Sequence, residues 1–585
     1  MMTAKISLTE KFFEQAALNQ EATAFYYCRP EDNRWVTMSW NRYREEVATL
    51  AAWFQAKGMT KGAKVGLISS NRPEWLISDL AILSIGGITI PIYPSASQND
   101  ISYILNHSEA EWLVVDTLDR IPYLKDTELK GLLVFNKSDE NDALAKHFKY
   151  PVSLYASAIA EGHPAIKAPM NMDADDLATI IYTSGTTGFP KGVMHTHHNL
   201  SEAMVSSGQI IKSPEGTVDR FFSFLPLSHV AERVLVEMGA ITIGAEVSFA
   251  RSVETIVEDL PRCQPTILLC VPRLWEKMQE GIMGKLNAAS PAKKMIFKLA
   301  NTMGSSRIEG NKIHAGAHAG IFPAVADALV GKKLRERLGL NRTRLFVTGS
   351  APTRPDLQKF FASFGMPIRE VYGLTENLCC GVLQIEEDIF VDNCGKPFPG
   401  NEMRIAEDGE IQFRAPWMFK GYYKNEEATR EVLSADGWFS TGDLGKIDAN
   451  GRLYITGRKK EMLKTSNGKY VAPVPIEDRV KGLPLIKEVM MVGDERKYCV
   501  ALIALEHPHL EERQREEIKS WIKKVNEPLA GYEAIKRIGV LKEGFTIENG
   551  SLTPTMKLKR SVVAKNKEAF IDRLYKSDDF LVMEA

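Results

Sequence analysis

The chain is poor in cysteine and carries almost no net charge. Seven cysteines occur in 585 residues, without a CxxC pair, so we expect neither a disulfide framework nor a zinc site. We interpret them as buried free thiols, which fit a reducing compartment. Lys and Arg total 73 against 74 Asp and Glu, whereas a nucleic-acid binder usually gathers a basic excess on one face. This balance argues against nucleic acid as a partner but leaves room for small anionic ligands.

The sequence also has no long hydrophobic run, although 44% of its residues are hydrophobic. The longest apolar stretch, residues 80–93, is interrupted by Gly86, Gly87 and Pro91, and a membrane-spanning helix needs roughly 20 apolar residues. The first residues, MMTAKISLTEKFF, include a lysine but no apolar region after it, so no secretory signal is visible. We therefore expect a soluble, cytoplasmic protein with large apolar cores.

Short apolar runs alternate with helical patterns through the first three quarters of the chain. Residues 64–69 (KVGLIS) are typical of a buried strand, residues 73–84 of a helix and residues 87–91 of the next strand. The same alternation recurs in residues 175–275. This order predicts an α/β fold with βαβ units and largely parallel sheets. Two such halves favour two packed sheets in one large N-terminal domain.

The sequence pattern changes after residue 395. Short β segments divided by Gly, Asp and Asn fill residues 395–457, with a strong hairpin turn at Asn450-Gly451. After Arg458 the chain becomes charged and includes the helix-like EERQREEIKSWIKKV. We predict a β-rich subdomain that completes an N-terminal domain of residues 1–457, and a small mobile α+β C-terminal domain of residues 458–585.

Residues 285–340 are rich in Ala, Lys and Arg, with apolar residues at helical spacing. The pattern predicts paired amphipathic helices. A helical insertion with a solvated basic face explains it, and so does contact with a membrane surface that delivers an apolar substrate. The sequence leaves both interpretations open.

The segment at residues 182–193 reads YTSGTTGFPKGV. Gly185 and Gly188 lack side chains, so backbone N–H groups can face a phosphate oxygen. Further donors and positive charge come from Thr183, Ser184, Thr186, Thr187 and Lys191. The usual P-loop, GxxxxGK[ST], is a different pattern, because here the glycines are three apart and the lysine follows a proline. An ordinary Ser/Thr/Gly solvent loop is the alternative.

Further motifs follow this loop in a fixed order. They are TGSAP at 348–352, VYGLTE at 371–376, STGDLG at 440–445, GRKKE at 457–461 and LTPTMKLKR at 552–560. Together with the loop they resemble the adenylate-forming superfamily, which includes acyl-CoA synthetases, luciferases and peptide-synthetase adenylation domains. The resemblance covers almost the whole chain and is greatest to bacterial long-chain fatty acyl-CoA synthetases, also through APVPIE at 472–477. It implies ATP-dependent conversion of a fatty acid to acyl-AMP and then acyl-CoA, with release of AMP and pyrophosphate.

The resemblance also implies a nucleotide site. Its residues, besides the phosphate loop, are Gly349, Ser350, Ala351, Glu370, Tyr372, Gly373, Thr375, Asp443 and Arg458. Tyr372 offers an aromatic face to adenine, although a core aromatic is the alternative. Asp443 can accept both ribose hydroxyls, and Thr375 is placed for the α-phosphate. Glu376 supplies the oxygen ligand that Mg²⁺ prefers beside substrate phosphates.

Two residues are implied in catalysis. Lys557 corresponds to a lysine that neutralises charge on the α-phosphate and the attacking carboxylate, which is catalysis by positioned charge. Met556 stands where glycine is usual, a variant familiar in long-chain members, and Lys559 is a nearby competitor. His229, in LPLSHVAERV, corresponds to a position near the carboxylate, and a satisfied core histidine is the alternative.

The second half-reaction involves two further positions. Lys460 matches a hinge at which the C-terminal domain rotates, and Gly468 matches a glycine of the tunnel for the CoA thiol. Asn467 replaces a usual glycine and tolerates a positive φ. The cluster His195, His197 and His198 looks metal-like, but relatives are commonly His-rich there, so we do not predict a metal at it.

Two other functions remain open at this stage. A fatty acyl-AMP ligase would pass the acyl group to a carrier-protein thiol, and the chain has no visible carrier domain. A catalytically inert relative would still bind ligands, but the retention of Lys557, Glu376 and Asp443 argues against it. The predicted partners are a fatty acid, ATP and CoA.

Overall fold

The computed structural model describes most of the chain. The described residues are 6–121, 124, 127–138, 145–146, 148–183, 189–315, 320–505, 510–546, 549–552 and 558–584. Part of the predicted phosphate loop, residues 184–188, and the predicted catalytic Lys557 lie outside these ranges.

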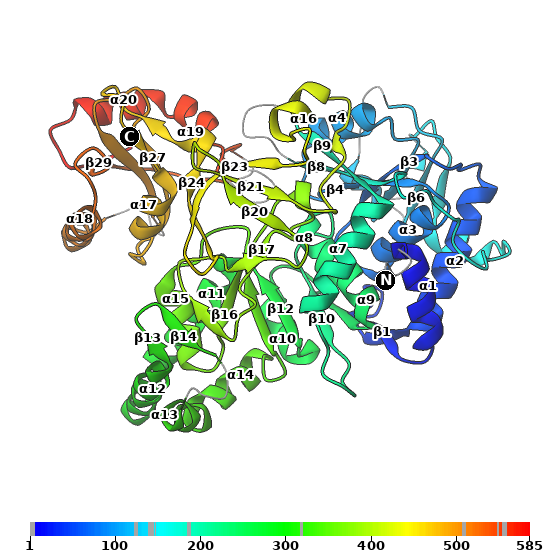
Figure 1. Cartoon of the computed structure of the whole chain (residues 1–585), viewed down its shortest axis with the longest axis horizontal. Helices are drawn as coiled ribbons and strands as arrows, with labels where there is room; N and C mark the ends of the chain where they lie inside the picture. Colours follow the sequence, from blue (N-terminus) through cyan, green and yellow to red (C-terminus); the bar gives the residue numbers. More distant parts are fainter. Residues whose placement is uncertain are drawn as a thin grey trace.

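An eight-stranded sheet forms one half of the N-terminal domain (Figure 1). Its order is β22-β9-β8-β4-β3-β5-β6-β7, in which β4, β3, β5, β6 and β7 are parallel to their neighbours and β8–β9 is an antiparallel hairpin. Strands β4, β5 and β6 are buried throughout, as parallel strands covered on both faces usually are. The strands are β3 (Lys64–Ile68), β4 (Ile88–Ile92), β5 (Trp112–Val115), β6 (Gly131–Val134), β7 (Val152–Leu154), β8 (Leu177–Thr183), β9 (Lys191–Thr196) and β22 (Gly421–Tyr422).

A nine-stranded sheet forms the other half, in the order β19-β17-β16-β15-β12-β10-β11-β1-β2. Its middle is parallel, and the N-terminal hairpin β1–β2 joins its edge through β11. The strands are β1 (Thr23–Cys28), β2 (Trp35–Ser39), β10 (Arg220–Ser223), β11 (Glu246–Phe249), β12 (Ile267–Cys270), β15 (Leu345–Thr348), β16 (Ile368–Tyr372), β17 (Val382–Leu383) and β19 (Lys396–Pro397). The prediction of two sheets in one large α/β domain is confirmed.

Helices pack between and around the two sheets. Helix α3 (Pro73–Ser84) has Pro at its first position, which suits a helix start, and is buried on nearly every side. The largest apolar core combines it with Leu67 of one sheet and Phe221 of the other, so the sheets share one interior. The remaining elements here are α1 (Leu8–Leu18), α2 (Trp40–Ala56), α4 (Gln98–Ser108), η1 (Leu118–Arg120), α6 (Tyr155–Ala160), α7 (His197–Ile210), α8 (Val230–Glu232), the π-helix η2 (Arg233–Gly239), α9 (Ala240–Ile243), α10 (Ile256–Cys263), α15 (Pro355–Ser363) and η6 (Thr375–Asn377).

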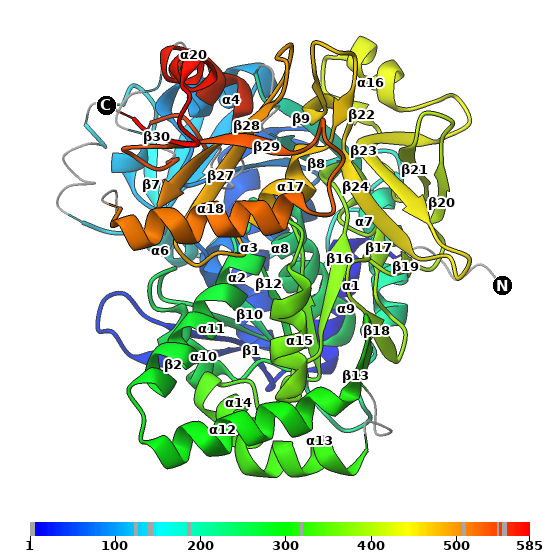
Figure 2. The same cartoon turned by 90° about the vertical axis from the view of Figure 1, so that its left-hand side faces the viewer.

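The helical insertion is present where the sequence predicts it. Helices α12 and α13 lie together at one end of the molecule, at the lower edge in Figures 1 and 2. A short hairpin, β13–β14, interrupts the helices and pairs with β18, which the amphipathic pattern did not predict. The elements are α11 (Pro272–Asn287), α12 (Pro291–Gly304), η3 (Ser305–Arg307), β13 (Ile308–Glu309), β14 (Lys312–His314), α13 (Ile321–Ala326), the π-helix η5 (Asp327–Gly331), α14 (Lys332–Leu338) and β18 (Asp388–Phe390).

Two four-stranded sheets and the two-stranded sheet β25–β26 lie in the later part of the described chain. The β-rich subdomain has the order β20-β21-β23-β24, and Gly451 takes a φ of +79° in the predicted hairpin turn between its last two strands. The C-terminal part packs a sheet of order β27-β28-β29-β30 against helices, as an α+β domain. The elements are β20 (Glu402–Ile405), β21 (Glu410–Arg414), α16 (Glu426–Val432), β23 (Phe439–Ile447), β24 (Leu453–Arg458), η7 (Lys459–Glu461), β25 (Leu463–Lys464), β26 (Tyr470–Val471), α17 (Pro473–Val480), β27 (Ile486–Val492), β28 (Cys499–Leu505), α18 (Glu512–Asn526), β29 (Ile535–Val540), α19 (Arg560–Asn566), α20 (Glu568–Lys576) and β30 (Leu581–Met583). The predicted domain boundary at residues 457 and 458 falls at the end of β24 and stays a prediction.

The cysteines are free, as predicted, and five of the seven are buried. Cys28 and Cys379 are partly exposed. Within the described ranges, no helix combines the length and the apolar character that a membrane crossing requires.

Two helical glycines give a matched test of this packing. A Cβ at Gly304, where α12 ends, would lie 1.9 Å from the carbonyl oxygen of Ser363 in α15, whereas a Cβ at Gly284 in α11 would meet nothing within 4 Å. We expect Gly304→Ala to lower the free energy of unfolding by about 1–3 kcal/mol through overpacking. Gly284→Ala should raise it by up to about 1 kcal/mol, because Ala is the better helix former. Thermal midpoints from calorimetry check both signs, and equal midpoints would contradict the close approach of α12 and α15.

Candidate active site

The TGSAP and VYGLTE motifs meet at the carboxyl ends of two neighbouring strands of the nine-stranded sheet. Strands β15 and β16 are parallel neighbours, so the residues after their carboxyl ends lie side by side. A Cβ at Gly349 would be 2.7 Å from a methyl group of Val371, and a Cβ at Gly373 would be 2.5 Å from the Cα of Cys379. Ser350 has a φ of +70°. These close approaches and the left-handed turn explain the small residues of the two motifs.

Asp443 is the centre of one group of predicted nucleotide residues. The Tyr372 hydroxyl donates to its Oδ2 at 2.6 Å, and the Arg458 Nε donates to its Oδ1 at 2.8 Å. Asp443 and Arg458 face each other in the β23–β24 ladder, and Asp443 is only 5% exposed. Burial, followed by the charge of Asp443, raises the pKa of Tyr372 well above its usual value, so this tyrosine stays a donor. Each carboxylate oxygen can accept a second hydrogen bond, which suits the two ribose hydroxyls.

Glu376 is the centre of a second group. The Tyr422 hydroxyl donates to its Oε1 at 2.8 Å, and the Lys191 Nζ lies 4.9 Å from the centre of the Tyr422 ring. Strand β22 carries Tyr422 and pairs with β9, whose first residue is Lys191. The predicted Mg²⁺ ligand and the predicted phosphate-loop lysine therefore both contact one tyrosine, the first at its hydroxyl and the second over its ring. Thr183 pairs with Lys191 across the β8–β9 hairpin, so the predicted phosphate loop begins and ends at paired positions of these two strands.

His195 connects this hairpin to Thr375. Its Nε2 lies 2.8 Å from the Thr375 carbonyl oxygen, and burial lowers the pKa of His195 to about 4. A neutral imidazole then donates its Nε2 proton to that carbonyl. Within the described part of the chain, no group of three or more His, Cys, Asp or Glu side chains is arranged to hold a metal. Neither His195 nor Tyr422 was predicted from the sequence as a site residue. Both contacts join residues that are far apart in the chain, and no local signal in the sequence marked either of them.

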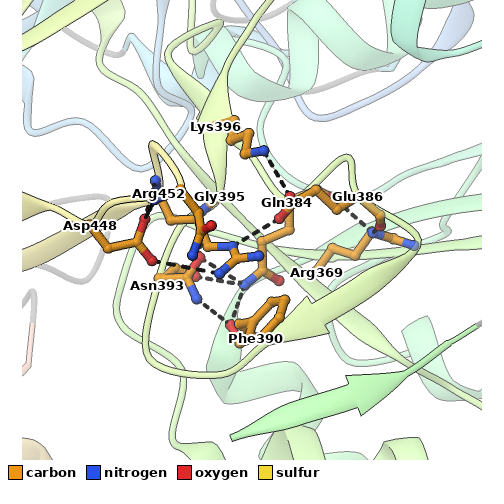
Figure 3. Close-up of polar contacts among 10 residues, drawn as sticks. Arg369, Gln384, Glu386, Phe390, Asn393, Gly395, Lys396, Asp448 and Arg452 are labelled. Atoms are coloured by element: carbon orange, nitrogen blue, oxygen red, sulfur yellow. Dashed lines mark hydrogen bonds and ion pairs between the residues drawn. The ribbon is translucent and has the colours of Figure 1, made fainter.

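Glu370 is bonded to Gln384, which belongs to the polar network that Figure 3 shows. Its Oε1 accepts the Thr353 N–H at 3.0 Å, and burial raises its pKa to about 8, so it is largely protonated at neutral pH. The Gln384 Oε1 accepts the Glu370 N–H at 3.1 Å, and the Gln384 Nε2 donates to the Asn393 carbonyl at 2.8 Å. This network fixes β16, the strand that ends in Tyr372. Ala351, another predicted nucleotide residue, is exposed.

His229 lies at the N-cap of α8. The Ala231 N–H donates to its Nδ1 at 3.1 Å, so the neutral ring carries its proton on Nε2. This hydrogen bond fixes the tautomer of a partly exposed histidine, and the catalytic role of His229 stays a prediction.

The predicted hinge and tunnel residues lie beyond Arg458. Lys460 is exposed in η7, directly after β24. Gly468 has a φ of +74° in the turn between β25 and β26, and a Cβ there would meet nothing within 4 Å. Both roles stay predictions.

Comparison with known proteins identifies the class to which this fold and site belong. Residues 12–423 match the AMP-binding enzyme family, and residues 460–579 match the AMP-binding enzyme C-terminal domain. The chain belongs to the AMP-binding enzyme family.

Two relatives of this chain carry names that give an activity. The chain is 33% identical to the long-chain-fatty-acid–CoA ligase FadD15 of Mycobacterium bovis, over 94% of each chain. It is 30% identical to the peroxisomal long chain acyl-CoA synthetase 7 of Arabidopsis thaliana, over 92% of this chain and 82% of that one. Among solved structures, the adenylation domain of a carboxylate reductase from Mycobacterium chelonae has a TM-score of 0.76 at 22% identity, covering 98% of this chain and 92% of that one. The likeness to that structure shows the shared fold.

Substitution of Asp443 tests the first group. We expect Asp443→Asn to weaken AMP binding about 10- to 100-fold, because hydrogen bonds to a charged group contribute about 1.5–3 kcal/mol. The measurement is the Kd for AMP by isothermal calorimetry. Asp436→Asn, an exposed aspartate of the same subdomain, is the control and should leave the Kd unchanged. An unchanged Kd in Asp443→Asn would remove Asp443 from the nucleotide site.

Proposed function

We propose that this enzyme is a long-chain fatty acid–CoA ligase, which activates its acid with ATP and releases AMP and pyrophosphate. The observation that carries the proposal is the junction of Asp443, Tyr372 and Arg458 in a chain of the AMP-binding enzyme family. Relatives named as long-chain-fatty-acid–CoA ligases match 94% of its length. The names support the substrate class, and the junction supports the proposed site for the nucleotide.

In the first half-reaction, a carboxylate oxygen of the fatty acid attacks the α-phosphorus of ATP. A new P–O bond forms, the bond to the β-phosphate oxygen breaks, and pyrophosphate leaves with the electron pair. Glu376, with the substrate phosphates, would hold Mg²⁺, which neutralises phosphate charge when bound. Lys191, Thr375 and Lys557 bind the phosphates, while Tyr372 and Asp443 hold adenosine.

In the second half-reaction, the C-terminal domain turns at Lys460 and withdraws Lys557. The thiolate of CoA, entering beside Gly468, attacks the acyl carbonyl, and AMP leaves as the C–O bond breaks. His229 corresponds to a family position near the carboxylate and the adenylate, so its ring would lie beside the acyl group in both half-reactions. The same chain thus catalyses both reactions, because rotation of the C-terminal domain brings a different face of that domain to the site.

Incubation with ATP, Mg²⁺, palmitate and CoA tests this function, with AMP and palmitoyl-CoA as the readout. Formation of both with CoA alone is the expected result. Turnover only with a carrier protein would replace the proposal by an acyl-AMP ligase, and failure to bind nucleotide would indicate an inert relative.

Lys557 gives a step-specific prediction. We expect Lys557→Ala to slow palmitate-dependent exchange of pyrophosphate into ATP about 100-fold or more, as loss of a positioned catalytic charge does. Conversion of supplied palmitoyl-adenylate to palmitoyl-CoA should change only a few-fold, because the lysine serves only the first conformation. Lys559→Ala is the matched control for the first step. Equal loss of both steps in Lys557→Ala would overturn its assignment.

We also propose that residues 285–340 make peripheral contact with an anionic membrane surface. Seven large apolar side chains are exposed within residues 295–329, including Met295 at 73%, Ile321 at 75% and Phe322 at 58%. Ile321, Val325 and Leu329 recur every four residues, which places them on one helical face. The other exposed apolar residues of this patch are Ile296 and Leu299.

Charge favours an anionic bilayer as the partner of this patch. Residues 285–304 contain Lys285, Lys293, Lys294 and Lys298 and no acidic residue, and these four lysines are exposed. Apolar side chains beside lysines are the composition of helices that lie in a membrane interface. A fatty acid partitions into such a surface, so contact would bring the enzyme to its substrate.

Vesicle sedimentation tests the contact. We expect binding to vesicles of phosphatidylglycerol and phosphatidylcholine, weakened at least about 10-fold by the double variant Ile321→Ser/Phe322→Ser, because burial of such side chains contributes about 1.5–3 kcal/mol each. Val253→Ser, an exposed valine outside the patch, is the control. Equal binding of all three proteins would overturn the proposal, as would a dimer in solution that the double variant dissociates.

A further inference from the structure

The loop that carries His229 is held by a residue of the opposite sheet. This residue is Asn71, between β3 and α3. Its Nδ2 donates to the Ser223 hydroxyl at 2.8 Å and to the Leu225 carbonyl at 2.6 Å, and lies 3.4 Å from a carboxyl oxygen of Glu232. Its Oδ1 accepts the Leu227 N–H at 3.1 Å. One carboxamide therefore uses its donors and its acceptor on the segment that runs from β10 to α8.

Glu232, near the other end of this segment, folds back onto its beginning through a hydrogen bond. Its Oε1 accepts the Phe224 N–H at 3.0 Å, and the side chain is almost completely buried. Burial raises the pKa of Glu232 to about 8, so at neutral pH the carboxyl is largely uncharged and suits the apolar surroundings. His229 lies in the chain between Phe224 and Glu232. Its backbone is thus fixed on both sides by contacts that converge on Asn71.

Arg233, the residue after Glu232, also attaches this part of the chain to α3 and to the eight-stranded sheet. The Arg233 Nη2 donates to Asp79 of α3 at 2.5 Å, and its Nη1 donates to the Thr179 hydroxyl of β8 at 2.8 Å. The guanidinium is buried and also bonds Glu237 at 3.0 Å. Removal of one partner would leave a buried charge unpaired and would damage the fold itself. Asn71 is uncharged, so its replacement probes the loop with less damage.

We propose that Asn71 is a positioning residue for His229, acting by holding residues 223–232 against the eight-stranded sheet. The inference rests on the proposed role of His229 in the acyl half of the site. Loss of the carboxamide frees Ser223, Leu225 and Leu227 and lets the imidazole leave its position. A displacement of about 1 Å in such a group can cost on the order of 100-fold in rate. Asn71 reaches the reaction through His229 and not through the nucleotide.

A double-mutant cycle tests this inference by palmitate-dependent exchange of pyrophosphate into ATP. We expect Asn71→Ala to lower kcat about 10- to 100-fold, with KM for ATP within about 2-fold of the wild type. The variant Asn71→Ala/His229→Ala should be no slower than His229→Ala alone, because the two residues act through one group. Additive losses would overturn the inference, since Asn71 would then act independently of His229.

Two further variants separate this role from a general loss of stability. Asn71→Asp keeps the volume of the side chain but loses its hydrogen-bond donors, so its kcat should match that of Asn71→Ala. If the alanine variant does not fold, Asn71→Asp replaces it in the double-mutant cycle. The Asn526 side chain exchanges hydrogen bonds with the Ile535 backbone in the C-terminal domain, at 2.9 Å each, and Asn526→Ala should keep the wild-type kcat. An equal loss in Asn526→Ala would indicate a merely structural effect. A wild-type rate in His229→Ala would instead reject the role of His229 and leave the ligase activity standing.

Discussion

The hydrogen-bonded junction at Asp443 is the interaction on which the arrangement of the site depends. A largely buried carboxylate is stable only when its charge is compensated, and here the donors come from β16 and from the end of β24. The carboxylate itself comes from β23. One anion thus ties the nine-stranded sheet to the β-rich subdomain, at the point where the chain continues into its C-terminal part. The carboxylate and its two donors therefore join the three strands β16, β23 and β24, on which three of the motifs lie.

Local pattern was sufficient to predict the parallel core. Residues 64–69, 73–84 and 87–91 were predicted as strand, helix and strand, and the structure has β3, α3 and β4 at Lys64–Ile68, Pro73–Ser84 and Ile88–Ile92. Continuous apolar runs and an N1 proline are short-range signals, so one sequence contains them. The motifs placed Tyr372, Asp443 and Arg458 in one site through resemblance, and the structure brings these three into direct contact.

Contacts that depend on distant parts of the chain could not be predicted. Strand β1 pairs with β11, and nothing in residues 23–28 indicates that partner. Tyr422 reaches Glu376 only because β22 adds to the edge of β9. Asn71 reaches the His229 loop only because the two sheets share one core. Such contacts follow from how elements assemble, whereas periodicity reports only what each element is.

The charged contacts around Lys460 are compatible with its proposed role as a hinge. On the C-terminal side, Arg560 bonds Glu461 at 3.2 Å and Glu477 at 2.7 Å, so α19, η7 and α17 are joined. On the other side, Arg458 holds Asp443 at 2.8 Å. The ion pair between Arg458 and Glu461 spans Lys460 and is the longest of these, at 3.8 Å. A partly exposed pair at that distance contributes little, typically below about 1 kcal/mol. Rotation at this proposed hinge would therefore break only this weak pair among the contacts named here, while the shorter contacts on both sides persist, and the proposed nucleotide residues would keep their places.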